Sequence, residues 1–183
     1  QKIVKVTQTI KHEGHGLDSK RQSEAHPHFI EQTPDQKRMF VCDLGTDEVV
    51  LYKVGEKGRL ERDEENSFQL APGSGPKKMI FTPDGKYAYV LNELSNTVCV
   101  YSYQDCQFTF IQEIDTYPKD EYTKESLAGD IVISEKGDYL FVSNRGHDSV
   151  AAFEVDSATG KLTYIEYLDT DEKPRAMILV NDR

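Results

Sequence analysis

The chain has 183 residues, 37% of them hydrophobic, and a formal net charge of −10 at pH 7. This length suits one ordinary domain, and no apolar run is long enough to cross a bilayer, so we expect no membrane partner. The negative charge disfavours a nucleic-acid partner, because nucleic-acid binders neutralise phosphates with lysine and arginine. A small anionic ligand remains compatible with it, since a few cations in one pocket can dominate the local potential.

The three cysteines, Cys42, Cys99 and Cys106, are odd in number and form no C-x-x-C pair. Two of them stand in strand-like apolar runs, a pattern typical of buried thiols in a reducing compartment. The cysteine pattern therefore predicts a cytoplasmic protein, and no signal peptide is visible. Because Gln1 opens directly into a strand-like run, we expect the natural N-terminus to lie upstream of it.

An internal repeat organises the chain. Three segments align: MFVCDLGTDEVVLYKV, AYVLNELSNTVCVYSY and LFVSNRGHDSVAAFEV. Their shared polar residues are Asp43, Asn92 and Asn144, which are 49 residues apart from 43 to 92 and 52 residues apart from 92 to 144. Each segment follows a lead-in of its own, and a further lead-in, PRAMILVNDR, starts at Pro174. Self-similarity at a period of about 50 residues indicates a repeat architecture.

Each unit is predicted to be almost entirely β. In the second unit, alternating apolar residues predict strands at about 77 to 82, 87 to 92, 97 to 103 and 107 to 113. Between the first two, Pro83-Asp84-Gly85-Lys86 is typical of a tight turn, because proline presets φ and glycine tolerates the left-handed region. Four short antiparallel strands per unit indicate a β-propeller blade.

The chain is therefore predicted to be all-β and to form part of a single propeller domain over residues 1–183. We expect about three and a half four-stranded antiparallel blades, at residues 26–75, 76–127 and 128–173, with the next starting at 174.

The hairpin geometry points to one end of each blade. Residues equidistant from a turn lie opposite one another, so Lys77 is expected opposite Asn92, with Glu93 just beyond. The same construction places His28 opposite Asp43 and Gly129 opposite Asn144.

The first strand of a propeller blade lines the central channel, so all these ends open on one face. The residues aimed at this channel mouth are His28, Lys77, Glu93, Asp130, Arg145 and Arg175. Charges there are costly unless they pair or bind a ligand, which makes the group a candidate site.

Three stretches carry a family resemblance: GLDSKRQSEAHPHF, GSGPKKMIFTPDGKYAYVLNELSNTVCVY and LAGDIVISEKGDYLFVSNRGHDSVAAFEV. Together they resemble the seven-bladed propeller lactonases, which include the propeller-type 6-phosphogluconolactonases and, more distantly, the fungal carboxy-muconate lactonizing enzymes. The similarity runs from about Gly14 to the end, and LNELSNT and SNRGHDS are its most specific parts. It implies that this chain is about half of a seven-bladed propeller, with a site that uses His28, Glu93 and Arg145.

The resemblance implies hydrolysis of a sugar δ-lactone, 6-phospho-D-glucono-1,5-lactone in the pentose phosphate pathway. Such an acyl transfer to water needs a base, a donor for the oxyanion and an acid for the ring oxygen, with no metal or cofactor. We assign Glu93 as the base, Arg145 as the oxyanion partner, His28 as proton donor or substrate ligand, Lys77 and Arg175 as phosphate ligands, and Asp130 as a further substrate-binding residue.

One departure from the family pattern leaves phosphate binding possible and disfavours muconate chemistry. Residues 75–78 read GPKK where the family pattern usually reads GPRH. Lysine keeps the charge but lacks the planar fork that grips an anion with two parallel hydrogen bonds.

Purely structural roles for these residues stay open. Glu93 is also compatible with an ordinary turn residue, although the repeat geometry favours a functional one, and Arg145 is compatible with a structural ion pair, including one with Glu93. The pair His26 and His28 has zinc-ligand spacing but no evident third ligand. We expect His147 to pack or cap its turn, and His12 and His15 to face solvent.

The whole fold is also compatible with a non-catalytic scaffold or a muconate-type enzyme, because a fold does not determine a function. Unequal residues at matched positions, Leu44, Glu93 and Arg145, favour a dedicated site over a scaffold.

Overall fold

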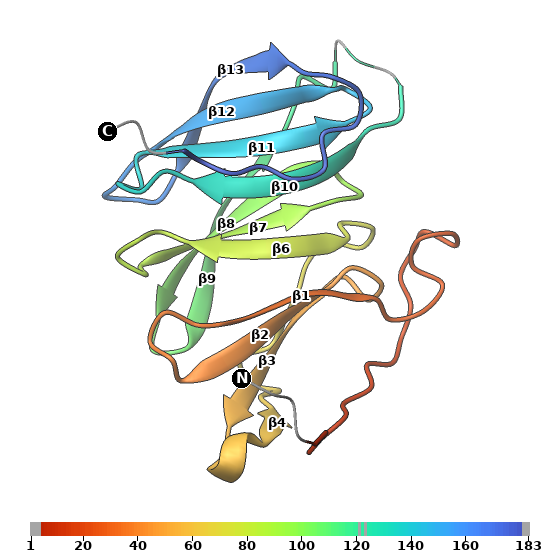
Figure 1. The fold of residues 1–183 in the computed structure, drawn as a ribbon, viewed down its shortest axis with the longest axis vertical. Helices are drawn as coiled ribbons and strands as arrows, with labels where there is room; N and C mark the ends of the chain where they lie inside the picture. The colour runs from red at the N-terminus through yellow and green to blue at the C-terminus, as the bar shows by residue number, and fades with distance from the viewer. Residues whose placement is uncertain (1–4, 121, 123, 181–183) are drawn as a thin grey trace.

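The computed structural model describes residues 5–120, 122 and 124–180, and strands dominate it (Figure 1). The first sheet contains β1 (Pro27–Gln32), β2 (Arg38–Asp43), β3 (Glu48–Val54), β4 (Leu60–Arg62) and β5 (Phe68–Gln69), with a 3₁₀ turn at Glu56–Gly58 before β4. The second contains β6 (Pro76–Phe81), β7 (Tyr87–Asn92), β8 (Thr97–Gln104) and β9 (Gln107–Asp115). The third contains β10 (Leu127–Ile133), β11 (Tyr139–Arg145), β12 (Ser149–Val155) and β13 (Leu162–Asp169).

The prediction of an all-β partial propeller is confirmed. Every neighbouring pair of strands within a sheet is antiparallel. The second and third sheets run in chain order, and so does β1 to β4 of the first sheet, in which β5 pairs with β3 beside β4. Residues 170–180 form no strand, so the predicted start of a next blade at 174 remains a prediction, as do the blade limits themselves. Among the described residues, no helix has the length and apolar character needed to cross a bilayer.

The three sheets lie side by side along the long axis of the molecule (Figure 1). Strand β6 contacts both β1 and β10, so the first strands of successive sheets are neighbours. This is the arrangement expected around a propeller channel, and it brings the same end of each sheet together.

Two apolar cores lie between the sheets, and strand β7 contributes to both. Tyr89 and Leu91 pack in the core shared with the third sheet, whereas Ala88 and Val90 pack in the core shared with the first. All four are fully buried. Successive side chains on a strand point to opposite faces, so the alternation splits β7 between its two neighbours. The middle sheet is therefore apolar on both faces.

The predicted cross-hairpin pairs are wrong by one residue, for the same reason in each blade. Asp43 pairs with Pro27, Asn92 with Pro76, and Asn144 with Ala128. A β-bulge inserts one extra residue near the start of each first strand, and this shifts the register. His28, Lys77 and Gly129 lie at these bulges.

The predicted turn after β6 is confirmed. The Gly85 amide donates to the Thr82 carbonyl at 2.8 Å, and Gly85 has φ +71°. A side chain there is also excluded by space, because an added Cβ would lie 2.9 Å from Pro34 Cβ of the preceding sheet.

A second repeated feature is a turn that joins each blade to the linker after it by hydrogen bonds. Asn96, between β7 and β8, has φ +56°. Its carbonyl accepts the Thr116 amide at 3.0 Å, and its side-chain amide donates to the Ser126 carbonyl at 2.7 Å. Asp47 and Asp148 occupy the matching turns, also at positive φ.

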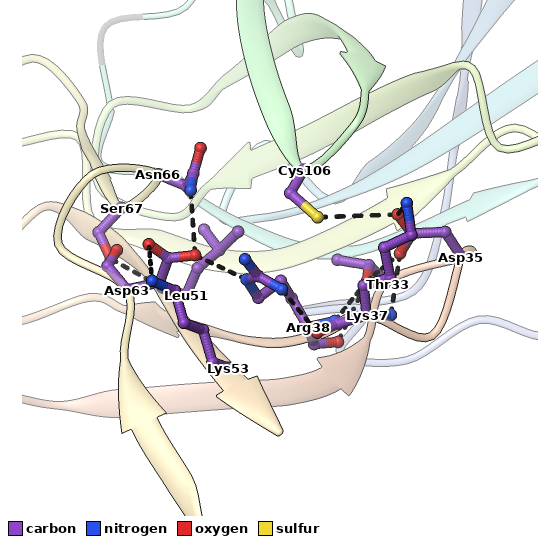
Figure 2. A network of polar contacts seen from close by, with 10 residues as sticks. All are labelled: Thr33, Asp35, Lys37, Arg38, Leu51, Lys53, Asp63, Asn66, Ser67 and Cys106. Carbon is purple, nitrogen blue, oxygen red and sulfur yellow. Dashed lines mark hydrogen bonds and ion pairs between the residues drawn. The ribbon is translucent and has the colours of Figure 1, made fainter. Parts of the chain in front are cut away.

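Asp63 lies between β4 and β5, and its carboxylate takes part in a network of polar contacts in the first sheet (Figure 2). Its buried carboxylate accepts from Arg38 Nε at 2.6 Å and from Asn66 Nδ2 at 3.0 Å. Burial alone would raise the pKa of Asp63, but these hydrogen bonds outweigh it and hold that pKa below its usual value.

All three cysteines are free and buried, as predicted. Burial raises the pKa of Cys99 to about 11, so its thiol is un-ionised at neutral pH.

Candidate active site

Glu93 directly follows β7, at the open end of the second sheet. Its amide donates to the Gly75 carbonyl at 2.8 Å, and its carbonyl accepts the Ala128 amide of the third sheet at 3.1 Å. Gly75 has φ +64°, and a Cβ there would lie 2.5 Å from Leu94 Cγ. The backbone of Glu93 is thus held between two sheets at a close approach that requires glycine.

Three cations surround the fully buried carboxylate of Glu93. Oε1 accepts a hydrogen bond from Arg21 Nη2 and Oε2 accepts one from Lys77 Nζ, while Arg145 Nη2 forms an ion pair with Oε2 at 2.6 Å. These cations come from the segment before β1, from β6 and from β11. We call Arg21, Lys77, Glu93 and Arg145 the Glu93 cluster. It holds three positive charges against one negative, although the chain as a whole carries −10.

The cluster keeps Glu93 ionised. Burial by itself would raise the pKa of Glu93, but the hydrogen bond and charge of Lys77, the charge of Arg145 and the hydrogen bond from Arg21 outweigh it, and the pKa lies below its usual value. Burial is also the main reason that the pKa of Lys77 is lowered, against the opposing pull of Glu93. With both oxygens engaged, Glu93 is a weak base in this arrangement.

Arg145 has an unused donor. Its Nη2 also donates to the Ala128 carbonyl at 3.0 Å, while its buried Nε has no acceptor among the described residues. Buried donors are usually paired, so an unpaired one beside a charged cluster is a candidate ligand contact.

His28 lies next to the cluster without joining its ion pairs. Partial burial lowers the pKa of His28, and the positive charge of Lys77 lowers it further, against a smaller opposing effect from Glu93. The imidazole is therefore mainly neutral at pH 7.

Two predicted site residues lie outside the cluster. Asp130 pairs with Lys78 Nζ at 2.8 Å and accepts the Met177 amide at 2.9 Å. Burial would raise the pKa of Asp130, but the Lys78 hydrogen bond and the Met177 amide outweigh it and leave that pKa lowered. Arg175 is exposed and belongs to none of the cluster's contacts. The substrate-binding roles of both residues remain predictions.

A family model described as a seven-bladed β-propeller lactonase matches residues 1–182. The chain belongs to this family. It is 38% identical over 162 residues to a 6-phosphogluconolactonase of Bacillus subtilis, covering 87% of this chain and 45% of that protein. Among solved structures, a putative 6-phosphogluconolactonase of Bacteroides fragilis superposes with a TM-score of 0.86 at 36% identity, covering 93% of this chain and 49% of that one. The periplasmic gluconolactonase of Pseudomonas aeruginosa superposes with a TM-score of 0.83 at 31% identity, covering 90% and 47%.

The chain spans about half the length of these relatives. The resemblance noted in the sequence is thus confirmed at the level of family and fold, and the Glu93 cluster lies on the first and second strands of lactonase-family blades and the segment before them.

Arg21 is the member of the cluster that sequence reasoning missed. It precedes the first blade, so it has no counterpart in the repeat and no hairpin geometry points to it. Its partner Glu93 is 72 residues away. The one available signal was its place in GLDSKRQSEAHPHF, a stretch that carries the family resemblance.

Other histidines lie away from the cluster. The expectation that His12 faces solvent is wrong: it lies between Asp43 Oδ2 and the Tyr52 hydroxyl, each at 2.6 Å, because the buried Asp43 carboxylate draws a polar partner. It lines a cavity of about 440 Å³ that also includes His28 but not Glu93. His15 is exposed and His147 stacks on Tyr117, both as predicted. No three metal-ligating side chains cluster within the described ranges.

Proposed function

We propose that the protein hydrolyses the internal ester of a sugar δ-lactone at the Glu93 cluster, with 6-phospho-D-glucono-1,5-lactone as the substrate. The main support for this proposal is that three cations converge on one buried carboxylate beside a neutral histidine. Two positive charges remain after Glu93 is counted, which favours a substrate that bears an anionic group. Family membership and the 38% identical Bacillus subtilis 6-phosphogluconolactonase support the same reaction class.

The proposed chemistry is attack of water on the lactone carbonyl carbon. The carbonyl oxygen gains negative charge, which the Arg145 guanidinium stabilises with its unused Nε–H and its positive charge. A base takes the proton of the attacking water, and the ring oxygen accepts a proton as its bond to the carbonyl carbon breaks. We assign the base role to Glu93 and, to the protonated form of His28, the donation of a proton to the ring oxygen.

The base role requires a change at Glu93. Both of its oxygens are hydrogen-bonded to cations, and a carboxylate held in this way has little tendency to take a proton. One of the three cations must therefore leave during binding of the substrate.

Replacing Glu93 tests the assignment. In the full-length protein, Glu93→Gln keeps the shape of the side chain but cannot accept a proton, and we expect kcat for 6-phosphogluconolactone to fall by about a hundredfold or more. The measurement is lactone consumption corrected for spontaneous hydrolysis. The matched control is Glu113→Gln on β9, an exposed carboxylate of the same sheet, which should leave kcat unchanged. Equal rates for Glu93→Gln and the unmodified protein would remove Glu93 from the mechanism.

We also propose that the protein works in the pentose phosphate pathway of a reducing cytoplasm. Three free, buried cysteines support the reducing compartment. Because one structural neighbour is named as periplasmic, cell fractionation is the appropriate test, and recovery in the periplasm would overturn this placement.

A further inference from the structure

The segment before β1 forms a closed loop that presents Arg21 to Glu93. The Gly16 amide donates to the Gln22 carbonyl at 2.9 Å, which closes the loop. Asp18 Oδ1 accepts the amides of Lys20 and Arg21 at 2.8 and 3.0 Å. These local bonds give the loop a defined backbone.

Gln22 anchors this loop to the first sheet. Its side chain is fully buried, and Nε2 donates to the Leu44 carbonyl at 2.8 Å and to Asp47 Oδ1 at 2.7 Å. The anchor fixes the backbone beside Arg21, whereas the long Arg21 side chain reaches across to the second sheet. The loop backbone is therefore held while the guanidinium has room to move.

Arg21 differs from the other two cations in exposure and in the oxygen it contacts. Its side chain is 37% exposed, against 14% for Lys77 and 13% for Arg145. Lys77 and Arg145 share Oε2, whereas Arg21 contacts Oε1. Departure of Arg21 would free one whole oxygen of Glu93, while the two more buried cations keep the carboxylate in place.

We propose that Arg21 recognises the anionic group of the substrate, and that its transfer from Glu93 to that group frees Glu93 Oε1 to take the proton of the attacking water. This inference rests on the proposed lactone hydrolysis. The guanidinium can grip a phosphate with two parallel hydrogen bonds, so one charge-assisted contact replaces another. A lactone without an anionic group offers no such exchange and leaves Glu93 fully paired.

Arg21 therefore couples recognition to catalysis and sets specificity for a phosphorylated substrate. It also supplies the planar fork that GPKK lacks at residues 75–78. The freed Glu93 loses one of the hydrogen bonds that lower its pKa, which makes it a stronger base.

The test compares Arg21→Gln with Lys20→Gln in the full-length protein. Lys20 is an exposed neighbour in the same loop, so both variants remove one positive charge from one place. Kinetics are measured with 6-phosphogluconolactone and with glucono-δ-lactone, which lacks the phosphate. Thermal unfolding of both variants checks that the loop substitution leaves the fold intact.

We expect Arg21→Gln to lower kcat/KM for the phosphorylated lactone by about tenfold to a hundredfold, the loss typical of one charge-assisted contact. For glucono-δ-lactone, kcat/KM should stay equal or rise, because Glu93 Oε1 is then permanently free. Lys20→Gln should change neither value, and Arg21→Lys should restore part of the phosphate preference. An unchanged preference in Arg21→Gln, or an equal loss of preference in Lys20→Gln, overturns the inference.

A binding measurement separates this inference from the proposed function. Calorimetric titration with 6-phosphogluconate and with gluconate needs no turnover. If the unmodified protein hydrolyses neither lactone, the proposed function fails, and with it the proton-transfer half of the inference. Weaker binding of 6-phosphogluconate but not of gluconate in Arg21→Gln would then still support Arg21 as the phosphate ligand, and unchanged binding of both would overturn it.

Discussion

Glu93 shows how strongly the role of one residue depends on its partners. Three cations make it a structural hub that joins the segment before β1, the second sheet and the third sheet. With one cation fewer, the same carboxylate becomes a candidate base. The ion-pair interpretation of Glu93 thus describes the carboxylate with all three cations bound, and the catalytic interpretation describes it after one cation has left.

The lowered pKa of His28 predicts how activity depends on pH. Burial and the charge of Lys77 keep its pKa below the ordinary 6.5, so it is neutral at pH 7 and becomes protonated only as the pH falls below that value. Because the ring oxygen takes its proton from the imidazolium form, we expect kcat/KM for 6-phosphogluconolactone to rise as the pH falls from 7 through the lowered pKa of His28. The profile is measured by lactone consumption between pH 5 and 8.

The contrasting variant is His28→Asn. It should lower kcat by about tenfold to a hundredfold and remove this rise of activity towards acidic pH. A rise that persists unchanged in His28→Asn would assign the titration to another group.

The elements are joined by short-range devices that repeat from blade to blade. Asn96 pairs with Thr116 and Ser126 from a left-handed turn, and Asp47 and Asp148 occupy matching turns. Each turn between the second and third strands thereby holds the linker that leads to the next blade.

Substitution of Asn96 separates the two parts of this device. Asn96→Gly keeps the left-handed backbone but loses the side-chain bond to Ser126, and we expect a loss of about 1–2 kcal/mol in the free energy of unfolding. Asn96→Ala also incurs the strain of positive φ, so its loss should be larger by about 1 kcal/mol. Urea unfolding of both variants is the measurement, and equal stability of the two would show that the backbone conformation contributes nothing.

The elements were predictable because their signals are local. The four strands of the second sheet agree with the predicted ranges to within about two residues, since alternation and the PDG turn need no knowledge of the rest of the chain. The bulges at His28, Lys77 and Gly129 were not predictable in this way, because an inserted residue leaves the apolar alternation of the partner strand intact.

At the scale of the whole molecule, ion pairs and apolar cores act together between the sheets. Glu93 links the second sheet to the third through Arg145, and Asp130 links the third to the second through Lys78. The core that includes Leu91 and Ile131 lies between the same two sheets. Long-range pairs of this kind explain why Arg21 was missed and why the pair of Lys78 with Asp130 was not predicted: a strand pattern places a residue on a face but does not choose its partner.

The lowered pKa values of Glu93 and Asp130 predict that the folded protein is less stable in acid. The folded-state pKa values of Glu93 and Asp130 are lowered from 4.5 and 3.8, so their stabilisation is present above those ordinary values and is lost as the pH falls through the lowered ones. We expect the free energy of unfolding to decrease below pH 4.5. Urea unfolding at stepped pH, followed by tyrosine fluorescence, measures it.

The Glu93→Gln variant serves as the comparison for this titration. It should begin less stable by about 1–3 kcal/mol, because three cations lose their shared carboxylate while partly exposed. Its dependence on pH should be shallower. An equal slope in both proteins would show that Glu93 contributes no proton linkage to folding.

The β-bulge at the start of each first strand has a consequence for how such a site can diversify. The extra residue stands outside the ladder that aligns the two strands, so His28 and Lys77 can differ without disturbing strand pairing. At Gly129 the position is more restricted, because an added Cβ would lie 2.5 Å from Ser143 Oγ of the paired strand. Histidine, lysine and glycine occupy this position in three successive blades while the neighbouring pairs keep the same register. In a propeller built in this way, the residue at the bulge of one blade can be substituted independently of the other blades. The set of side chains at the channel mouth can therefore change, and with it the substrate, while the fold stays the same.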